Sequence, residues 1–274
     1  MPRLLYDSPV QTASGCGIKP TFLRLGVFGM KSVVVFLRTV LFHLAVFLFT
    51  AVYSSLSIGL IFLLPYEARF RYLTIYSRTI IYLAKVICGI GYRVEGLENF
   101  HQQRAFVVLA KHQSQWETFF LVNLLFPVAI VCKKELLKLP MGVGVGIGSL
   151  KPIAVDRSDP KQALKDISTQ GRQRLLEDNM PVLLFPEGTR TAPGERRKYA
   201  RSGAALAIAA GVPAVFVSHN AGYFWPATTL LKYPGTVVVR ISPPVDTAGK
   251  TATQLTDMAA EWIEPRVADP AQEP

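Results

Sequence analysis

The chain has 274 residues, 50% of them hydrophobic, and a formal net charge of +11 at pH 7. That length fits one large domain plus an anchor, and the hydrophobic share is high for a soluble protein but low for one with many membrane spans. No zinc-finger, RNP or helix-turn-helix pattern accompanies the charge, so nucleic acid is not the expected partner. An anionic membrane surface and anionic substrates account for both the charge and the apolar residues.

Cysteines and histidines point away from a disulfide or a metal. The three cysteines are far apart and form no C-x-x-C motif, and the four histidines lack the spacing of metal ligands. We therefore expect neither a disulfide framework nor a metal site.

The N-terminal part is expected to anchor the chain in a membrane, with residues 1–30 loose and residues 31–90 forming the anchor. From Thr39 to Pro65 there is no Asp, Glu, Lys or Arg. As one helix this segment would be about 40 Å long, more than the hydrocarbon core of about 30 Å. Either the helix tilts across the bilayer, or it breaks among the small polar residues of Ser54–Gly59 and re-enters on its own side. Basic residues flank both ends, which gives no orientation and favours the re-entrant form. The length disfavours a buried helix of a soluble protein.

An amphipathic helix and then an α/β domain are expected downstream. Basic and apolar residues alternate at spacings of three and four in residues 70–90, so this helix lies on the membrane surface or packs on the domain. Short β-rich runs then alternate with helical ones, which predicts a sheet with ligands at the strand ends. The expected strands are 106–110, 128–131, 152–155, 182–185, 212–217 and 236–241, and the expected helices are 162–177, 203–210 and 255–263.

The motif Lys111–Thr118 pairs a histidine with a carboxylate at the end of an apolar run. Histidine has an unperturbed pKa near 6.5 and can take a proton from a hydroxyl at physiological pH. His112 and Glu117 do not share a helix face, so a turn must bring them together. Ser114 and Glu117 have the spacing of a capping box, which supplies such a turn. Glu117 either only caps that helix, or orients His112 and stabilises its imidazolium.

A second cluster, Phe185–Arg190, follows another expected strand. Gly188 permits close backbone approach, and Arg190 can bind a phosphate through two parallel hydrogen bonds. Glu187 can bond a glycerol hydroxyl or hold Arg190. The simpler alternative is a turn with a surface ion pair.

Together the two clusters resemble the signatures of the glycerolipid acyltransferase family, His-x4-Asp and Phe-Pro-Glu-Gly-Thr. They are most similar to those of the 1-acylglycerol-3-phosphate (lysophosphatidic acid) acyltransferases. The chain has Glu117 where most of the family has Asp. The resemblance covers roughly residues 91–245. It implies a glycerol-3-phosphate acyltransferase-like α/β fold, with a mixed sheet flanked by helices behind the hydrophobic anchor.

The resemblance also implies roles for individual residues. The acid of the family's first motif orients the histidine, which favours that role for Glu117. Arg157 stands where the second motif has its arginine, and Lys133 matches a family lysine near the acyl or phosphate oxygens. A solvated surface charge is an equal alternative for Lys133. The implied substrate-binding residues are Lys133, Arg157, Glu187, Gly188, Thr189 and Arg190.

Two further features invite other interpretations. Alternate glycines in Gly142–Gly148 lack the spacing of a dinucleotide-binding fingerprint and more readily allow close packing. They could also leave room for an acyl chain, in which case Gly144→Leu should shorten the preferred acyl length. Cys132 could suggest an acyl-cysteine intermediate, but the direct transfer of the family makes one unnecessary.

The resemblance implies an O-acyltransferase that uses acyl-CoA or acyl-carrier protein and converts 1-acylglycerol 3-phosphate to phosphatidate, with His112 as general base. No metal or bound cofactor is required. Membrane lipids and the acyl donor are the expected partners. We expect a catalytic domain at 91–264 on the cytoplasmic face of a bacterial inner membrane, and a tail at 265–274. Alternatives are the same chemistry on a lysophospholipid, a lyso-aminolipid or glycerol 3-phosphate, or a non-catalytic protein that binds anionic lipid.

Overall fold

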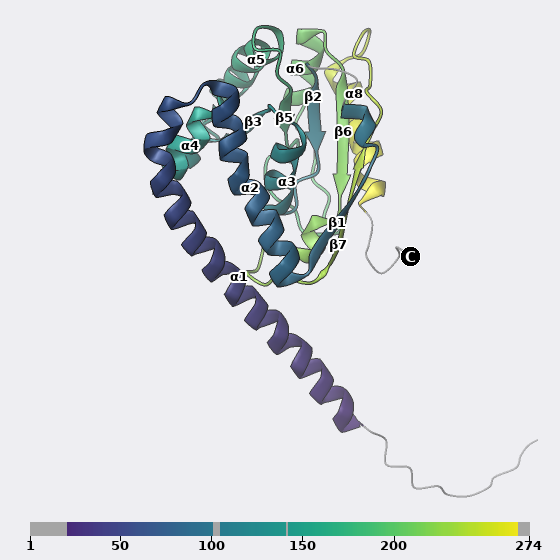
Figure 1. Cartoon of the computed structure of the whole chain (residues 1–274). Helices are drawn as coiled ribbons and strands as arrows, with labels where there is room; N and C mark the ends of the chain where they lie inside the picture. Colours follow the sequence, from purple (N-terminus) through teal and green to yellow (C-terminus); the bar gives the residue numbers. More distant parts are fainter. Residues whose placement is uncertain (1–20, 101–104, 141, 268–274) are drawn as a thin grey trace, which may run out of the picture. The chain divides into compact units, whose positions relative to one another are not determined.

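The computed structural model describes residues 21–100, 105–140 and 142–267 (Figure 1). The chain divides into two units, of which the second begins at Val35. Everything below concerns this second unit, apart from the start of the first helix. The expected tail at 265–274 lies mostly outside the described residues.

The first helix, α1 (Thr21–Leu63), corrects two expectations about the anchor. It begins at Thr21, so the loose N-terminus does not extend to residue 30. It also runs through Ser54–Gly59 without a break. Ser55 Oγ and Ser57 Oγ donate to the carbonyls of Ala51 and Tyr53, at 2.7 and 2.5 Å. These hydroxyls are satisfied inside the helix, so the small polar cluster does not interrupt it.

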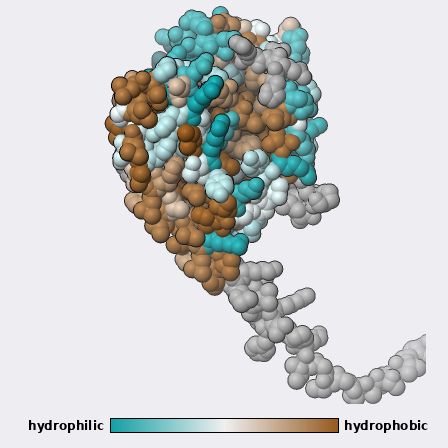
Figure 2. Space-filling model, in the orientation of Figure 1, coloured by the Kyte–Doolittle hydropathy of each residue, from teal (hydrophilic) through white to brown (hydrophobic). Residues whose placement is uncertain are grey.

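The apolar side chains of α1 remain largely exposed. The segment Ser32–Leu63 is long and apolar enough to cross a membrane, and little of it is buried in the protein. Large hydrophobic residues from Phe36 to Leu63 point outward, and Figure 2 shows brown, hydrophobic side chains along this side of the domain. Exposure of so many apolar groups marks a membrane-associated surface.

The second helix, α2 (Tyr66–Cys88), packs on the domain and on α1, which distinguishes between the two predicted positions of the amphipathic helix. Tyr72 stacks on Tyr53 of α1, with ring centroids 5.1 Å apart. On the other side, Ser77 Oγ donates to Asn123 Oδ1 at 2.6 Å. α2 therefore lies between α1 and the α/β domain and joins the two.

A seven-stranded mixed sheet forms the centre of the domain, in the order β1-β7-β6-β2-β5-β3-β4. All neighbouring strands are parallel except β6 and β7. The strands are β1 (Ile90–Glu95), β2 (Val107–Ala110), β3 (Ala129–Lys133), β4 (Ile153–Val155), β5 (Val182–Leu184), β6 (Ala214–His219) and β7 (Gly235–Ile241).

Helices cover both faces of the sheet, so the predicted fold class is confirmed (Figure 1). One apolar core lies between the sheet and α2 and α3, and a second between the sheet and α5, α6 and α8. The remaining elements are α3 (Trp116–Leu124), α4 (Val143–Ser149), α5 (Pro160–Leu176), α6 (Ser202–Ala210), α7 (Ala221–Phe224), α8 (Ala252–Ile263), and the 3₁₀ turns η1 (Leu97–Phe100), η2 (Lys134–Lys138) and η3 (Glu264–Arg266).

The sheet places the predicted site residues on one edge. His112 follows β2, and Lys133 is the last residue of β3. Arg157 follows β4, and Glu187 follows β5. Because β2, β5, β3 and β4 are parallel neighbours, their carboxyl ends meet at the same edge, where ligands of α/β sheets usually bind.

Candidate active site

The imidazole ring of His112 is held by a hydrogen bond and a stacking contact, which leave one ring nitrogen free. Its Nδ1 lies 2.8 Å from Glu117 Oε1, and its ring stacks on Phe185 with centroids 4.1 Å apart. Because the carboxylate accepts from Nδ1, that nitrogen carries the proton of the neutral ring and Nε2 keeps its lone pair. Among the described residues Nε2 has no hydrogen-bond partner. This is the arrangement that a general base requires.

Glu117 makes the contacts that both alternative roles require, one to the ring of His112 and others to the turn before α3. Its Oε1 also accepts from the backbone N–H groups of Gln113 and Ser114, at 3.1 and 2.9 Å. The predicted capping box is only half formed, because Ser114 Oγ accepts from Trp116 N at 3.0 Å. Gln115 already has helical dihedrals and is the residue before α3, so the serine closes a tighter turn than expected. That turn brings His112 and Glu117 together.

His219, to which the sequence assigned no specific role, lies behind this pair. Its Nδ1 accepts from Ala221 N at 3.2 Å, so Nε2 carries the proton and donates to Lys111 O at 2.8 Å. Burial lowers the pKa of His219 below its ordinary value. Burial alone would raise the pKa of Glu117, but the His219 ring and the hydrogen bonds from His112 and Ser114 hold it below its ordinary value. Glu117 thus stays ionised inside the fold.

Glu187 points inward rather than to the surface. Its Oε2 accepts from the backbone N–H of His112 at 2.6 Å. Its Oε1 accepts from Lys111 Nζ at 2.6 Å and from Thr191 Oγ1 at 2.7 Å. The side chain is fully buried, so the predicted contact with a glycerol hydroxyl would need this frame to open. The alternative ion pair with Arg190 is absent from the described contacts.

Two residues that the sequence reasoning missed complete this frame. Lys111 is buried beside Glu187, and Thr191 N donates to His112 O at 2.8 Å. The backbone of His112 is therefore held at its N–H by Glu187 and at its carbonyl by Thr191. The only feature of the sequence that could have drawn attention to Lys111 is its position directly before the motif histidine. Nothing in the sequence indicates that its side chain is buried.

Two arginines converge on the turn after β5. Gly188 has a φ of 71°, a conformation that favours glycine, and it is exposed together with Thr189. Arg157 donates from Nη1 to Gly188 O, and Arg190 donates from Nε to Ser114 O at 3.0 Å. Burial, aided by the nearby charge of Arg190, lowers the pKa of Arg157. Two guanidinium groups near one exposed turn can attract a phosphate.

Lys133 is exposed at the end of β3, and its side chain has no ion pair or hydrogen bond among the described residues. Its predicted role near the acyl or phosphate oxygens stays a prediction. Cys132, its neighbour, is buried, and burial raises the pKa of the thiol to about 11. A thiol in this state is a poor nucleophile, consistent with direct transfer.

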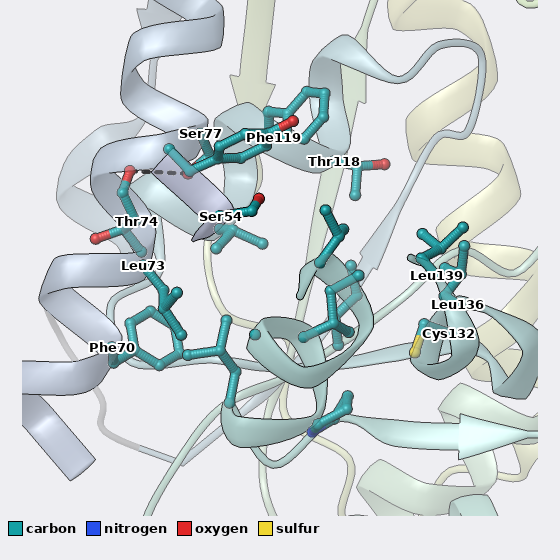
Figure 3. A pocket seen from close by; sticks show the side chains of 18 of the residues that line it. Ser54, Phe70, Leu73, Thr74, Ser77, Thr118, Phe119, Cys132, Leu136 and Leu139 are labelled. Carbon is teal, nitrogen blue, oxygen red and sulfur yellow. Dashed lines mark hydrogen bonds between the residues drawn. The ribbon is translucent and has the colours of Figure 1, made fainter. Parts of the chain in front are cut away.

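An apolar cavity of 390 Å³ lies beside the catalytic motif (Figure 3). Ser54 comes from α1, Thr74 and Ser77 from α2 and Phe119 from α3, while Leu139 lines the other side. Gln115, Thr118 and Arg190 also line it, so the cavity extends to the two motif clusters. This volume lies within the range of small-molecule sites and its lining suits a hydrocarbon chain.

The glycine run forms α4 and contributes to the cavity wall, but not through the expected residue. Gly142 and Gly146 line the cavity, whereas Gly144 does not. A Cβ on Gly144 would lie 2.3 Å from Leu137 O, so Gly144→Leu would disrupt the packing of α4 on η2 instead of filling the cavity. A Cβ on Gly146 meets only Leu73 Cδ2, at 3.6 Å. Gly146 is therefore the better position for testing whether a side chain at this run shortens the preferred acyl chain.

Comparison with known proteins gives a consistent family. The acyltransferase family model matches residues 91–220. A 1-acyl-sn-glycerol-3-phosphate acyltransferase from Pseudomonas aeruginosa is 42% identical over 237 residues, which are 85% of this chain and 91% of that protein. An enzyme with the same name from Limnanthes douglasii is 29% identical over 220 residues, 78% of this chain and 75% of that protein.

The fold has a counterpart among solved structures. The crystal structure of a 1-acyl-sn-glycerophosphate acyltransferase from Thermotoga maritima superimposes with a TM-score of 0.70 at 24% identity. The match covers 86% of this chain and 96% of that one. At this identity the likeness supports the fold.

Proposed function

The chain belongs to the family of 1-acyl-sn-glycerol-3-phosphate acyltransferases, and we propose that it carries out this reaction with His112 as the general base. The product is phosphatidate, made by esterifying the sn-2 hydroxyl of 1-acylglycerol 3-phosphate. The observation that supports the assignment of the base is the pairing of Nδ1 with buried Glu117, which leaves Nε2 free in a motif whose Gln115 and Thr118 line the apolar cavity.

His112 Nε2 takes the proton of the sn-2 hydroxyl as the oxygen attacks the carbonyl carbon of the acyl thioester. Glu117 stabilises the imidazolium that forms. The tetrahedral intermediate then expels the thiol, which takes its proton from the imidazolium. Proton transfer by a positioned base typically accelerates such reactions by about 10²–10⁴-fold.

The acceptor phosphate is proposed to lie against the cations around the turn after β5. Arg157 donates one N–H to the carbonyl of Gly188 in this turn, and Arg190, which lies in the turn, donates one to Ser114 O, so other guanidinium donors remain for phosphate oxygens. Lys133 is a further candidate, for the phosphate or for the carbonyl oxyanion. Glu187 is proposed to serve this site by holding His112.

An acyl chain is proposed to occupy the cavity. Its walls are apolar, and it begins next to Gln115 and Arg190, so a chain inside it would place its carboxyl end near His112. The donor thioester is acyl-CoA or acyl-carrier protein. No bound cofactor or metal takes part in the proposed reaction.

The apolar surface of α1 supports association with a membrane. We place the enzyme at a bacterial inner membrane with the catalytic domain on the cytoplasmic face, where acyl thioesters are available. The substrate and product are themselves membrane lipids.

Detergent-purified protein given radiolabelled acyl-CoA and 1-acylglycerol 3-phosphate tests the reaction and the base together. The wild type should release thiol and form phosphatidate, and His112→Ala should lose at least about 10²-fold in turnover. His43→Ala, in α1, is the matched control and should stay active. Near-normal turnover by folded His112→Ala would contradict the mechanism. If no acylated product forms from either acyl-CoA or acyl-carrier protein, with 1-acylglycerol 3-phosphate or with other lysolipid acceptors, a lipid-binding role becomes the better account.

A further inference from the structure

The C-terminal end of the domain contacts the catalytic frame from behind. α8 ends at Ile263, and Glu264 begins η3. The carbonyl of Ile263 accepts from buried Ser218 Oγ at 3.0 Å. Glu264 Oε1 accepts from Lys111 Nζ at 2.9 Å. Ser218 directly precedes His219 in β6, and Lys111 directly precedes His112 after β2, so the junction of α8 and η3 is attached next to both histidines of the site.

Lys111 connects the two carboxylates. Its side chain is 1% exposed, and its ammonium lies 2.6 Å from Glu187 Oε1 and 2.9 Å from Glu264 Oε1. A buried ammonium needs such partners, because an uncompensated charge in the interior is strongly destabilising. The other oxygen of Glu187 holds the amide of His112. The path from Glu264 to the catalytic base thus has only Lys111 and Glu187 between them.

Glu264 is itself fixed in place. Tyr199 Oη donates to Glu264 Oε1 at 2.8 Å, and Arg196 Nε lies 3.9 Å from Oε2. Burial and the hydrogen bond to Glu264 raise the pKa of Tyr199, so it stays a neutral donor. Ordered partners of this kind are what hold a supporting carboxylate within the tolerance of a catalytic geometry.

We infer that Glu264 is a positioning residue for His112: through Lys111 it holds the Glu187 carboxylate where that carboxylate fixes the His112 backbone. The inference rests on the proposed function, in which His112 is the base. Glu264 lies beyond the residues 91–220 that match the family model, so the working catalytic unit extends to the end of α8. A displacement of about 1 Å at a catalytic group can cost about 10²-fold in rate, so loosening this path should be visible in turnover.

The first test compares Glu264→Gln with Glu261→Gln in the full-length enzyme. Glu261 is exposed near the end of α8, three residues before Glu264, so it controls for removing a negative charge from the same part of the chain. Glu264→Gln should lower kcat by roughly 10–100-fold while leaving the KM of donor and acceptor unchanged, because Glu264 contacts neither. Glu261→Gln should match the wild type.

A second test uses the hydroxyl that holds Glu264. Tyr199→Phe removes only one oxygen and is expected to fold. It should lower kcat less than Glu264→Gln does, and the double variant should be no slower than Glu264→Gln alone, because both changes act on one path. Losses that multiply in the double variant would overturn the inference.

A readout without substrate separates this inference from the proposed function. Hydrogen–deuterium exchange followed by mass spectrometry reports the amide of His112, which Glu187 protects. That amide should exchange faster in Glu264→Gln than in Glu261→Gln when the two variants are compared equally far below their melting temperatures. If the wild type forms no phosphatidate, the proposed function fails and exchange alone decides this inference. Equal exchange in the two variants, or a kcat loss fully explained by a smaller folded fraction, would overturn it.

Discussion

Oε1 of Glu117 accepts from His112 Nδ1 at 2.8 Å and, at the same time, from two backbone amides of the turn that joins these residues. The atom that shapes the turn is therefore the atom that orients the ring. The tight turn before α3 brings the carboxylate of Glu117 within hydrogen-bonding distance of Nδ1, so a Glu can serve at this position although most of the family has Asp.

Substituting Glu117 separates its two roles. Glu117→Gln keeps an oxygen that can accept the turn amides but removes the charge that stabilises an imidazolium. We expect turnover to fall by about 10²–10⁴-fold with little change in melting temperature. Glu117→Asp should keep partial activity. Steady-state kinetics and thermal melts on the three proteins check this, and wild-type rates in Glu117→Gln would leave only the capping role.

Arg190 is expected to act on the acceptor. Arg190→Ala should raise the KM for 1-acylglycerol 3-phosphate by roughly 10–100-fold, the value of a hydrogen bond to a charged group. The effect on kcat should be smaller. Arg197→Ala, an exposed arginine further along the same loop, is the control. A loss of folded protein with unchanged KM would favour the simple surface-turn interpretation of this segment.

Chain-length preference tests the cavity. Gly146→Leu should place a side chain in the cavity and shift the preferred acyl-CoA to shorter chains, measured as kcat/KM across a series of donors. Gly148→Leu makes the same change on the same helix, at an exposed glycine that does not line the cavity. It should leave the profile unchanged. Identical profiles for both variants would place the acyl chain elsewhere.

The buried His219 should make the fold sensitive to acid. Burial lowers its folded-state pKa, so between that value and the ordinary value near 6.5 the unfolded chain binds more protons. The contribution of the neutral His219 to the free energy of unfolding is fully present above about pH 6.5 and is lost as the pH falls below that value. The groups facing the ring include the nearby Glu117, whose Oε2 lies 4.0 Å from Nε2.

Melting temperatures between pH 8 and pH 5 check this expectation. His219→Gln can still donate to Lys111 O but does not titrate, so its melting temperature should depend less on pH than that of the wild type. Parallel curves for the two proteins would show that His219 does not cause the acid sensitivity.

The α/β fold class was predictable because strands alternate with helices along the chain. The edge of the sheet that holds the site was predictable because both motifs follow apolar strands. His112 and Glu117 were paired correctly because a short turn connects them. The partners of Glu187 were not predictable, since Lys111 and Glu264 meet only through the order of the strands and the return of α8. Glu187 therefore looked like a surface ligand although it is buried.

One local pattern misled, and another gave no signal for the helix that it forms, each for a physical reason. The serines of Ser54–Gly59 suggested a helix break, but their hydroxyls bond to carbonyls within α1. The glycine-rich run gave no helical signal because glycine is a poor helix former. The run nevertheless forms α4, in which Gly144 packs on the backbone of Leu137 and leaves no room for a side chain, as the expected close packing requires.

The contribution of α1 to the cavity wall has a practical consequence for preparing this enzyme. Tyr53, Ser54 and Ser57 belong to the hydrophobic helix and also line the cavity. Deleting the helix to obtain a water-soluble fragment would therefore open the compartment proposed for the acyl chain. Solubilisation of this protein is better sought in amphipols or nanodiscs than in truncation, because the anchor is a structural part of the catalyst.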